Sequence, residues 1–262
     1  MPATKESTIE IPEIRKGRMF VHVIGTRPYI HNCMNSHAME VLTLPPRKKN
    51  SAERQSTLKH DPMAEFRRSP IYLSDPSAPT LLAVMSSAFK GAMATAALDL
   101  PGTKKAQIGR LVYVEGDYTP IYGVPKLMAS VVRSADMNRT PDVRFRAVLP
   151  RWACKVEITY VEPILKASSI INLVSAGGVT AGIGDWRPEK GKGDFGQYQI
   201  VRPDDPEYLS IVKGGRAEQE AAMENPEPYD SVTADLLKWF HDEVKARGFT
   251  VAEDEEEETE DA

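Results

Sequence analysis

The chain has 262 residues, 41% of them hydrophobic and 27% charged, and its formal net charge is −4. This composition suits a single domain with large insertions around a good-sized core. Only two cysteines, Cys33 and Cys154, occur, and no apolar run approaches the roughly 20 residues of a membrane span, which excludes a disulfide framework and a transmembrane protein.

The expected organisation is a core with flanking segments. We expect residues 1–17 to form a loose N-terminal arm and residues 18–201 to form the core. Two stretches of the core, 26–84 and 117–151, are predicted insertions, because they are rich in proline or basic residues. After the core we expect a linker at 202–229, a C-terminal helix at 230–248 and a disordered acidic tail at 249–262.

Several segments have the residue spacing of strands or helices. In chain order they are a strand at Met19–Gly25, a helix at Ser86–Gly102, a strand at Arg110–Gly116, a strand at Ala153–Val161, a helix at Ile164–Gly177, a strand at Phe195–Val201 and a helix at Asp230–Arg247. The first six of these predict an α+β fold. Their order indicates a ferredoxin-like (RRM-like) βαββαβ core, with two helices on one face of an antiparallel sheet.

Basic residues are concentrated in two of these regions. Lys90 lies in the first turn of the Ser86–Gly102 helix, where a bound anion would explain a cation that the helix dipole disfavours; an exposed lysine is the alternative. The insertion at 117–151 mixes aromatic residues with Lys126, Arg133, Arg139, Arg144, Arg146 and Arg151. Such surfaces bind phosphates and stack on unpaired bases, although arginine–aspartate pairs would also account for these residues.

A glycine-rich stretch lies between the second core helix and the last strand. Residues 171–201 contain seven glycines, with Arg187, Lys190 and Lys192 among them. Because glycine reaches positive φ and has no Cβ, such a loop can line a concave anion site with backbone N–H groups. A long hairpin without a ligand is the alternative.

The charge is uneven, since residues 253–262 hold eight acids and no base and the rest of the chain carries +4. A basic body with an acidic tail suits a nucleic-acid binder whose tail competes for the groove or recruits another protein. A solvated tail without such a role would have the same composition.

Three motifs occur in the order that one protein family has. They are a first strand ending in GTRPYIH, a helix start SSAFKGAM, and a loop AGIG followed by GDFGQYQI. Together they resemble the RAMP superfamily, and within it the repeating backbone subunits of CRISPR effector complexes. The resemblance implies a fold that binds the backbone of single-stranded RNA, many copies side by side, in a prokaryotic cytoplasm. It matches Lys90, Gly182, Gly184, Phe195 and Gly196 to the family's binding segments.

Residues 185–193 are longer and more charged than the usual loop of that family, and the acidic tail has no counterpart in it. A phage- or plasmid-borne protein that binds or anneals single-stranded DNA in recombination or replication therefore stays open as an alternative.

Catalytic and metal sites are weaker hypotheses. Family members that cleave RNA use an aspartate after the first strand; Asp61 and Asp75 lie in that region, but neither has the expected spacing. A metal-free endoribonuclease could use His22, His31 and Tyr29. A zinc site could use His31, Cys33 and His37, with His60 as a fourth ligand, but the spacing matches no common zinc pattern. We expect no catalysis, no metal and no cofactor.

We therefore expect a sequence-independent binder of single-stranded nucleic acid, with RNA favoured, that assembles with copies of itself as a filament or ribonucleoprotein backbone. Other subunits, or a protein recruited by the tail, are further expected partners. The residues expected to hold the strand are Lys90, Lys126, Arg133, Arg139, Arg144, Arg146, Gly182, Gly184, Arg187, Lys190, Lys192 and Phe195.

Overall fold

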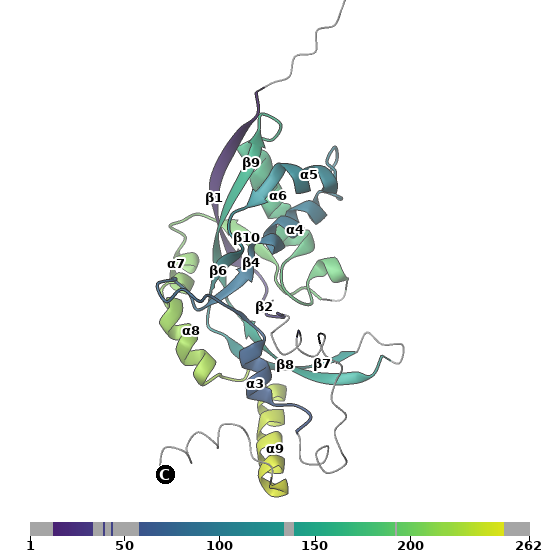
Figure 1. The fold of residues 1–262 in the computed structure, drawn as a ribbon, viewed down its shortest axis with the longest axis vertical. Helices are drawn as coiled ribbons and strands as arrows, with labels where there is room; N and C mark the ends of the chain where they lie inside the picture. Colours follow the sequence, from purple (N-terminus) through teal and green to yellow (C-terminus); the bar gives the residue numbers. More distant parts are fainter. Residues whose placement is uncertain are drawn as a thin grey trace, which may run out of the picture.

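The computed structural model describes residues 13–33, 39, 43, 58–133, 139–191 and 193–248. The fold is mixed α+β, with a curled antiparallel sheet and several helices (Figure 1). The expected acidic tail at 249–262 and residues 1–12 of the expected arm lie outside the described residues. No helix of the described residues is both long enough and apolar enough to span a membrane.

The larger sheet is seven-stranded and antiparallel. Across it lie β10 (Tyr198–Val201), β1 (Arg15–Gly25), β9 (Ala153–Glu162), β6 (Tyr118–Tyr122), β4 (Leu82–Met85) and β3 (Ile71–Tyr72). The remaining strand, β5 (Val112–Val114), pairs with the end of β9, whose start pairs with β6. The sheet therefore branches at β9.

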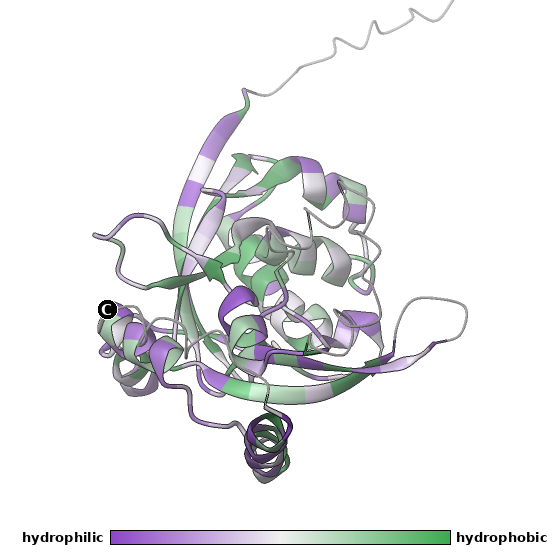
Figure 2. Ribbon diagram, turned by 60° about the horizontal axis from the view of Figure 1, so that its bottom comes forward, coloured by the Kyte–Doolittle hydropathy of each residue, from purple (hydrophilic) through white to green (hydrophobic). Residues whose placement is uncertain are grey.

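Two helices cover one face of this sheet. α4 (Ser86–Ala96) packs on α6 (Ala167–Ala176) and on β5, while α6 also contacts β1 and β10. Phe89, Met93 and Leu173 are buried between the helices and the sheet, and Figure 2 shows apolar residues gathered there. The two core helices predicted from the sequence are confirmed, with shorter bounds.

The predicted strand at Arg110–Gly116 is wrong at its start. Arg110 and Leu111 belong to α5 (Lys105–Leu111), and the strand β5 begins only at Val112. Burial of Ile108 holds this helix against the core, and the Val112 N–H donates to the Ile108 carbonyl. The buried Ile108 thus keeps Arg110 and Leu111 in the helix, although the β-branched Val112 and Val114 that follow them favour a strand.

The two expected insertions supply regular structure to the fold. The first contains β2 (Tyr29–Ile30), α3 (Pro62–Arg68), β3 and β4, and the second contains β6, β7 (Lys126–Arg133) and β8 (Pro141–Leu149). A three-stranded sheet, in the order β2-β8-β7, joins the two segments. Leu127, Phe145 and Ala147 of this sheet are buried in the main core.

Residues 202–229 differ from the expected linker. They contain α7 (Pro206–Val212), capped by Asp205, and α8 (Gly215–Glu224). The fully buried amide of Gln219 accepts hydrogen bonds from the N–H groups of Leu81 and Leu82 and donates to the carbonyls of Ile121 and Gly123. One polar side chain therefore fixes α8 across the ends of β4 and β6.

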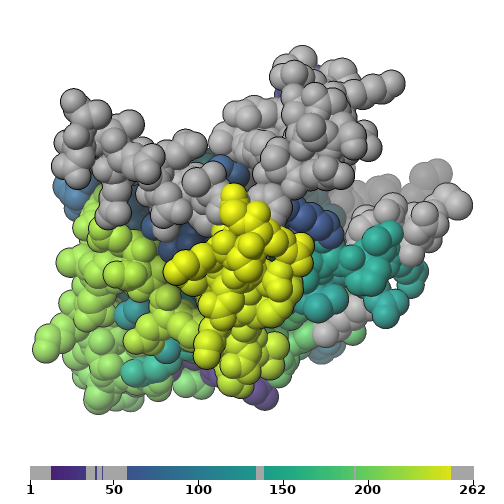
Figure 3. Space-filling model, turned by 90° about the horizontal axis from the view of Figure 1, so that it is seen from below, coloured from purple at the N-terminus to yellow at the C-terminus, as the bar shows by residue number. Residues whose placement is uncertain are grey.

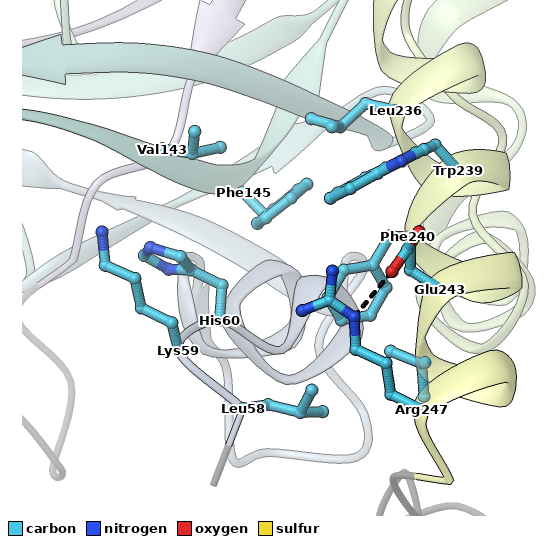
Figure 4. Close-up of a pocket in the computed structure, with 11 residues that line it drawn as sticks. Leu58, Lys59, His60, Val143, Phe145, Leu236, Trp239, Phe240, Glu243 and Arg247 are labelled. Carbon is cyan, nitrogen blue, oxygen red and sulfur yellow. Dashed lines mark hydrogen bonds and ion pairs between the residues drawn. The ribbon is translucent and has the colours of Figure 1, made fainter. Parts of the chain in front are cut away.

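The predicted C-terminal helix is confirmed as α9 (Ser231–Arg247), capped by Asp230 and ended by Gly248 in a left-handed conformation. Seen from below, it lies between α7–α8 and the β7–β8 hairpin (Figure 3). A cavity of about 280 Å³ separates it from β8 (Figure 4), with Trp239 and Phe240 facing Phe145. This cavity is mostly apolar, and its ionic groups already pair with acids, as Arg247 does with Glu243.

Candidate nucleic-acid groove

The start of α4 lies at an open part of the surface. Met85 precedes the helix, and no side chain in the described part of the chain caps it. The Ser86 N–H donates to the Asp117 carbonyl at 2.9 Å. Because an α-helix offers no acceptor for the N–H groups of its first turn, those of Ser87 and Ala88 have no partner within the helix. A helix start of this kind favours anions through both its N–H groups and its dipole.

Hollows meet at this helix start. One of about 640 Å³ lies between β2, β3, α4 and the glycine loop. A second, of about 280 Å³, separates α4 from that loop, and a third, of about 370 Å³, lies between α4, β5 and β6. Met85 lines all of them, while Ala88, Gly184 and Arg187 line both the first and the second. The hollows therefore lie side by side and share walls, and we call them together the α4 groove.

Lys90, Lys105 and Arg187 line the groove. The Lys90 ammonium lies 4.7 Å from the ring centre of Tyr113, and the Lys105 ammonium donates to the Thr95 hydroxyl at 3.3 Å. Neither lysine forms an ion pair with an acid among the residues that the structure describes. Their charges are thus available to an anionic ligand.

Arg187, by contrast, is already engaged. Its Nε pairs with Glu189 at 2.8 Å, and its Nη1 donates to the Gly184 carbonyl at 2.8 Å. Burial alone would raise the pKa of Glu189, but hydrogen bonds from Arg187 and Thr95 outweigh it and hold that pKa below its usual value. Glu189 therefore stays ionised and would compete with a phosphate for this guanidinium.

Exposed tyrosines form part of the groove walls. Tyr72, Tyr113 and Tyr118 are 42%, 42% and 50% exposed. The Tyr72 hydroxyl donates to the Arg67 carbonyl at 2.6 Å, and the Tyr113 hydroxyl donates to the Arg110 carbonyl at 2.8 Å. These bonds fix two of the rings at the surface, as a stacking platform requires.

The glycine loop is packed closely on its own chain. It begins as a π-helix at Gly177–Ala181 and includes a 3₁₀ turn at Pro188–Lys190. Gly184 has φ +81°, and a Cβ there would lie 2.6 Å from the ring of Tyr29. The Asp185 N–H donates to the Ile30 carbonyl at 3.2 Å. The loop is therefore docked on β2, and it lines the groove with Gly182, Ile183, Gly184, Asp185, Arg187 and Glu189.

The structure separates the two arginines of the V-R-F-R motif. Both lie on one face of β8, but Arg144 is exposed, whereas the Arg146 side chain is only 4% exposed and pairs with Asp185. Arg146 also donates to the Ser130 hydroxyl at 3.0 Å and lies 5.0 Å from the Trp186 ring centre. Burial lowers its pKa, although Asp185 opposes the shift. The expectation that Arg146 holds phosphates conflicts with this burial.

The other predicted binding residues do not line the α4 groove in its described part. Lys126 pairs with Glu227 at 2.8 Å, and Phe195 packs edge-on against Trp186 with ring centres 5.9 Å apart. Arg133 and Arg139 lie exposed near the ends of β7 and β8, Lys190 is exposed in the 3₁₀ turn, and Lys192 lies outside the described residues. The groove thus brings together Lys90, Gly182, Gly184 and Arg187 from the predicted set.

Lys105, Tyr72 and Tyr113 line the groove without having been predicted. Lys105 reaches it because α5 folds back on α4, and Tyr72 because β3 pairs with β4. Both contacts depend on tertiary structure, and no local pattern marks them. The interleaving of Lys90 with tyrosines of later strands is likewise visible only in the folded chain.

The two aspartates proposed for catalysis have structural roles. Asp61 caps α3 by accepting from the Ala64 N–H at 2.9 Å. Asp75 accepts from the Ser77 hydroxyl and N–H in a turn, and these bonds lower its pKa. Neither residue lines the described groove. Of the histidines considered for cleavage, His22 packs edge-on against Tyr208, and His31 is buried beside Tyr29.

The residues considered for zinc do not form a cluster in the part of the chain that the structure describes. His60 lies between two carboxylates, 2.7 Å from Glu65 and 3.0 Å from Asp142. His31 and Cys33 line the largest hollow, and His37 lies outside the described residues.

Comparison with known proteins gives no assignment. No protein-family model matches the chain, and no curated protein resembles it significantly. The function must therefore be argued from the groove itself.

The stability of the fold should depend on pH through His31. Burial lowers the pKa of this imidazole to about 3, whereas in the unfolded chain it is about 6.5. Between these two pKa values the unfolded chain binds a proton at His31 and the folded chain does not. The free energy of unfolding therefore falls as the pH drops from 6.5 toward 3. Between pH 7 and pH 5.5 the free energy of unfolding should fall by about 1 kcal/mol from this residue.

Urea unfolding of the wild type and of His31→Phe at both pH values measures this effect. Other groups titrate equally in the two proteins, so the difference between them isolates His31. An equal loss of stability in both proteins would show that the imidazole is not held neutral.

Proposed function

We propose that the core is ferredoxin-like and that the chain is a RAMP-type protein. Strands β10, β1, β9 and β5 lie in the order expected for a βαββαβ chain, in which the first and second strands flank the third. α4 follows β1 and precedes β5, α6 links β9 to β10, and both helices pack on one face. The additional strands β3, β4 and β6 extend this frame on one side.

On this frame we propose that the protein binds single-stranded nucleic acid, RNA in preference to DNA, as a repeating subunit along the strand. The α4 groove is the observation that carries the proposal. It brings together the first-turn N–H groups of Ser87 and Ala88, the cations Lys90 and Lys105, and exposed tyrosines on adjoining surfaces. Within the described residues no side chain caps that helix start and no acid pairs with either lysine. Phosphates would bind at the helix start, while bases would stack on the rings.

The binding would be electrostatic for the backbone and tolerant of sequence. Every phosphate neutralised by a lysine releases counterions, so the affinity should fall steeply as salt is raised. Fluorescence anisotropy of labelled rU20, dT20 and a mixed RNA at two salt concentrations tests this. Absent binding, or binding that salt does not weaken, would contradict the proposal, and a preference for dT20 would favour the single-stranded DNA alternative.

Lys90 offers the most direct test of a single phosphate contact. In Lys90→Ala we expect a several-fold lower affinity for rU20 and a salt slope smaller by about 0.7, because one phosphate contact on a single strand is lost. Lys126→Ala is the matched control, since that lysine already pairs with Glu227 at 2.8 Å. Equal losses in the two variants would mean that the α4 groove is not the binding surface.

A further inference from the structure

The largest hollow of the α4 groove has walls of a particular chemistry. The exposed side chains of Tyr72, Tyr118 and Met85 line it, together with the buried residues Tyr29 and His31. Its volume of about 640 Å³ falls within the range of small-molecule sites. Two aromatic rings and a thioether at an open mouth suit a flat, polarisable ligand.

Polar groups also occur in this hollow. Asp185, fixed by Arg146, lines one wall together with Gly184 and Arg187 of the same loop. His31 lines the hollow as well, and its Nε2 has no hydrogen-bond partner among the described residues. Burial keeps this imidazole neutral at physiological pH, so it adds no charge to the wall of the hollow.

The hollow lies next to the part of the groove that would hold phosphates. Met85, Ala88, Gly184 and Arg187 line both this hollow and the one between α4 and the glycine loop. A nucleotide whose phosphate lies at the start of α4 would therefore have its base beside the opening of the hollow. A fully stacked strand would leave the hollow unused, whereas a base turned out of the stack would fill it.

We propose that this hollow holds one base of the bound strand, stacked on Tyr72 and Tyr118. This inference rests on the proposed function, because the base reaches the hollow from a backbone held in the α4 groove. It assigns the base stacking of that function to one base in this hollow and to two named rings, a contact which a strand without bases cannot make. Each subunit then contacts one base of the strand, whichever base occupies that position.

The experiment compares labelled rU20 with a strand of the same length and charge in which stable abasic riboses replace the nucleotides. Stacking one base on an aromatic residue typically changes affinity by about tenfold. We expect the wild type to bind rU20 about tenfold more tightly than the abasic strand. In Tyr72→Ala with Tyr118→Ala this ratio should fall toward one, through weaker binding of rU20 and unchanged binding of the abasic strand.

Two further variants separate stacking from other effects. Tyr72→Phe keeps the ring and should keep the ratio. Phe20→Ala removes an aromatic side chain of similar exposure, 49%, from β1, where it contacts Lys155 and lines none of the described hollows of the groove. This control should also keep the ratio.

The outcomes distinguish the two proposals. A wild type that binds both strands equally overturns the base site and leaves the backbone groove standing. A wild type that binds neither strand overturns the proposed function, and the base site with it. An unchanged ratio in the double alanine variant overturns the assignment of Tyr72 and Tyr118.

Discussion

Arg146→Ala is expected to lower the free energy of unfolding by about 3 kcal/mol. Arg146 is 4% exposed and pairs with Asp185, whose own side chain is 28% exposed. Removing the guanidinium would leave a largely shielded carboxylate without its cation, and would also remove the hydrogen bond to Ser130 and the contact with Trp186. Because Asp185 keeps some access to water, we expect the lower end of the range known for broken buried pairs.

Urea unfolding of Arg146→Ala beside Arg144→Ala measures this difference. Arg144 lies two residues away on the same strand and is exposed, so its removal should change stability by less than about 0.5 kcal/mol. A second comparison, Arg146→Met with Asp185→Ala, should recover much of the loss, since neither partner is then left unpaired. Equal stability of Arg146→Ala and Arg144→Ala would contradict a structural role for the pair.

The pair also determines how the groove is built. Arg146 belongs to β8 of the smaller sheet, while Asp185 belongs to the glycine loop that follows α6. The Asp185 N–H bonds to Ile30 of β2, the strand next to β8. The ion pair therefore fixes the loop to the smaller sheet, and this places Gly184 and Arg187 opposite α4. Arg146 therefore supports a wall of the groove without lining any of its described hollows.

Much of the fold could be predicted because the signals are local. The run of apolar and β-branched residues in Met19–Gly25 lies within one strand, and the Asp230 cap and terminal glycine belong to one helix, α9. The helices of 202–229 could not be predicted in the same way. Their attachment depends on Gln219, a polar residue whose burial makes sense only because four backbone groups of distant strands meet it.

Part of the lining of the candidate groove could be predicted as well. Lys90 and the loop glycines were identified through a resemblance of motifs, and the structure places Lys90, Gly182 and Gly184 along one groove. Arg144 and Arg146 look equivalent in the sequence, yet one faces solvent and the other is buried. The difference arises from Asp185, 39 residues further along the chain. At that distance along the chain, no local pattern indicates that Asp185 is the partner of Arg146.

The glycines of the loop serve close packing more than ligand approach. Gly196 has φ +70°, its N–H donates to the Pro28 carbonyl at 2.7 Å, and its carbonyl accepts from the Ile183 N–H at 3.0 Å. A Cβ at this position would overlap the Ile183 carbonyl. Gly191 has the same φ, +70°, but a Cβ there would meet no atom of the described residues within 4 Å. Substituting alanine at Gly191 therefore tests backbone strain alone, whereas substituting it at Gly196 tests strain and steric overlap together.

Gly196→Ala should lower the free energy of unfolding by about 3 kcal/mol, of which the left-handed backbone accounts for about 1 kcal/mol and overpacking for the rest. Gly191→Ala should show only the first of these, about 1 kcal/mol. Urea unfolding measures both changes in stability. Fluorescence anisotropy with rU20 should show weaker binding in Gly196→Ala alone. The new methyl group would push Ile183 away, and with it the neighbouring Gly182 and Gly184 that line the groove. Equal stability of the two variants would show that the loop is free to move away from Ile183, and the groove would then lack a fixed wall.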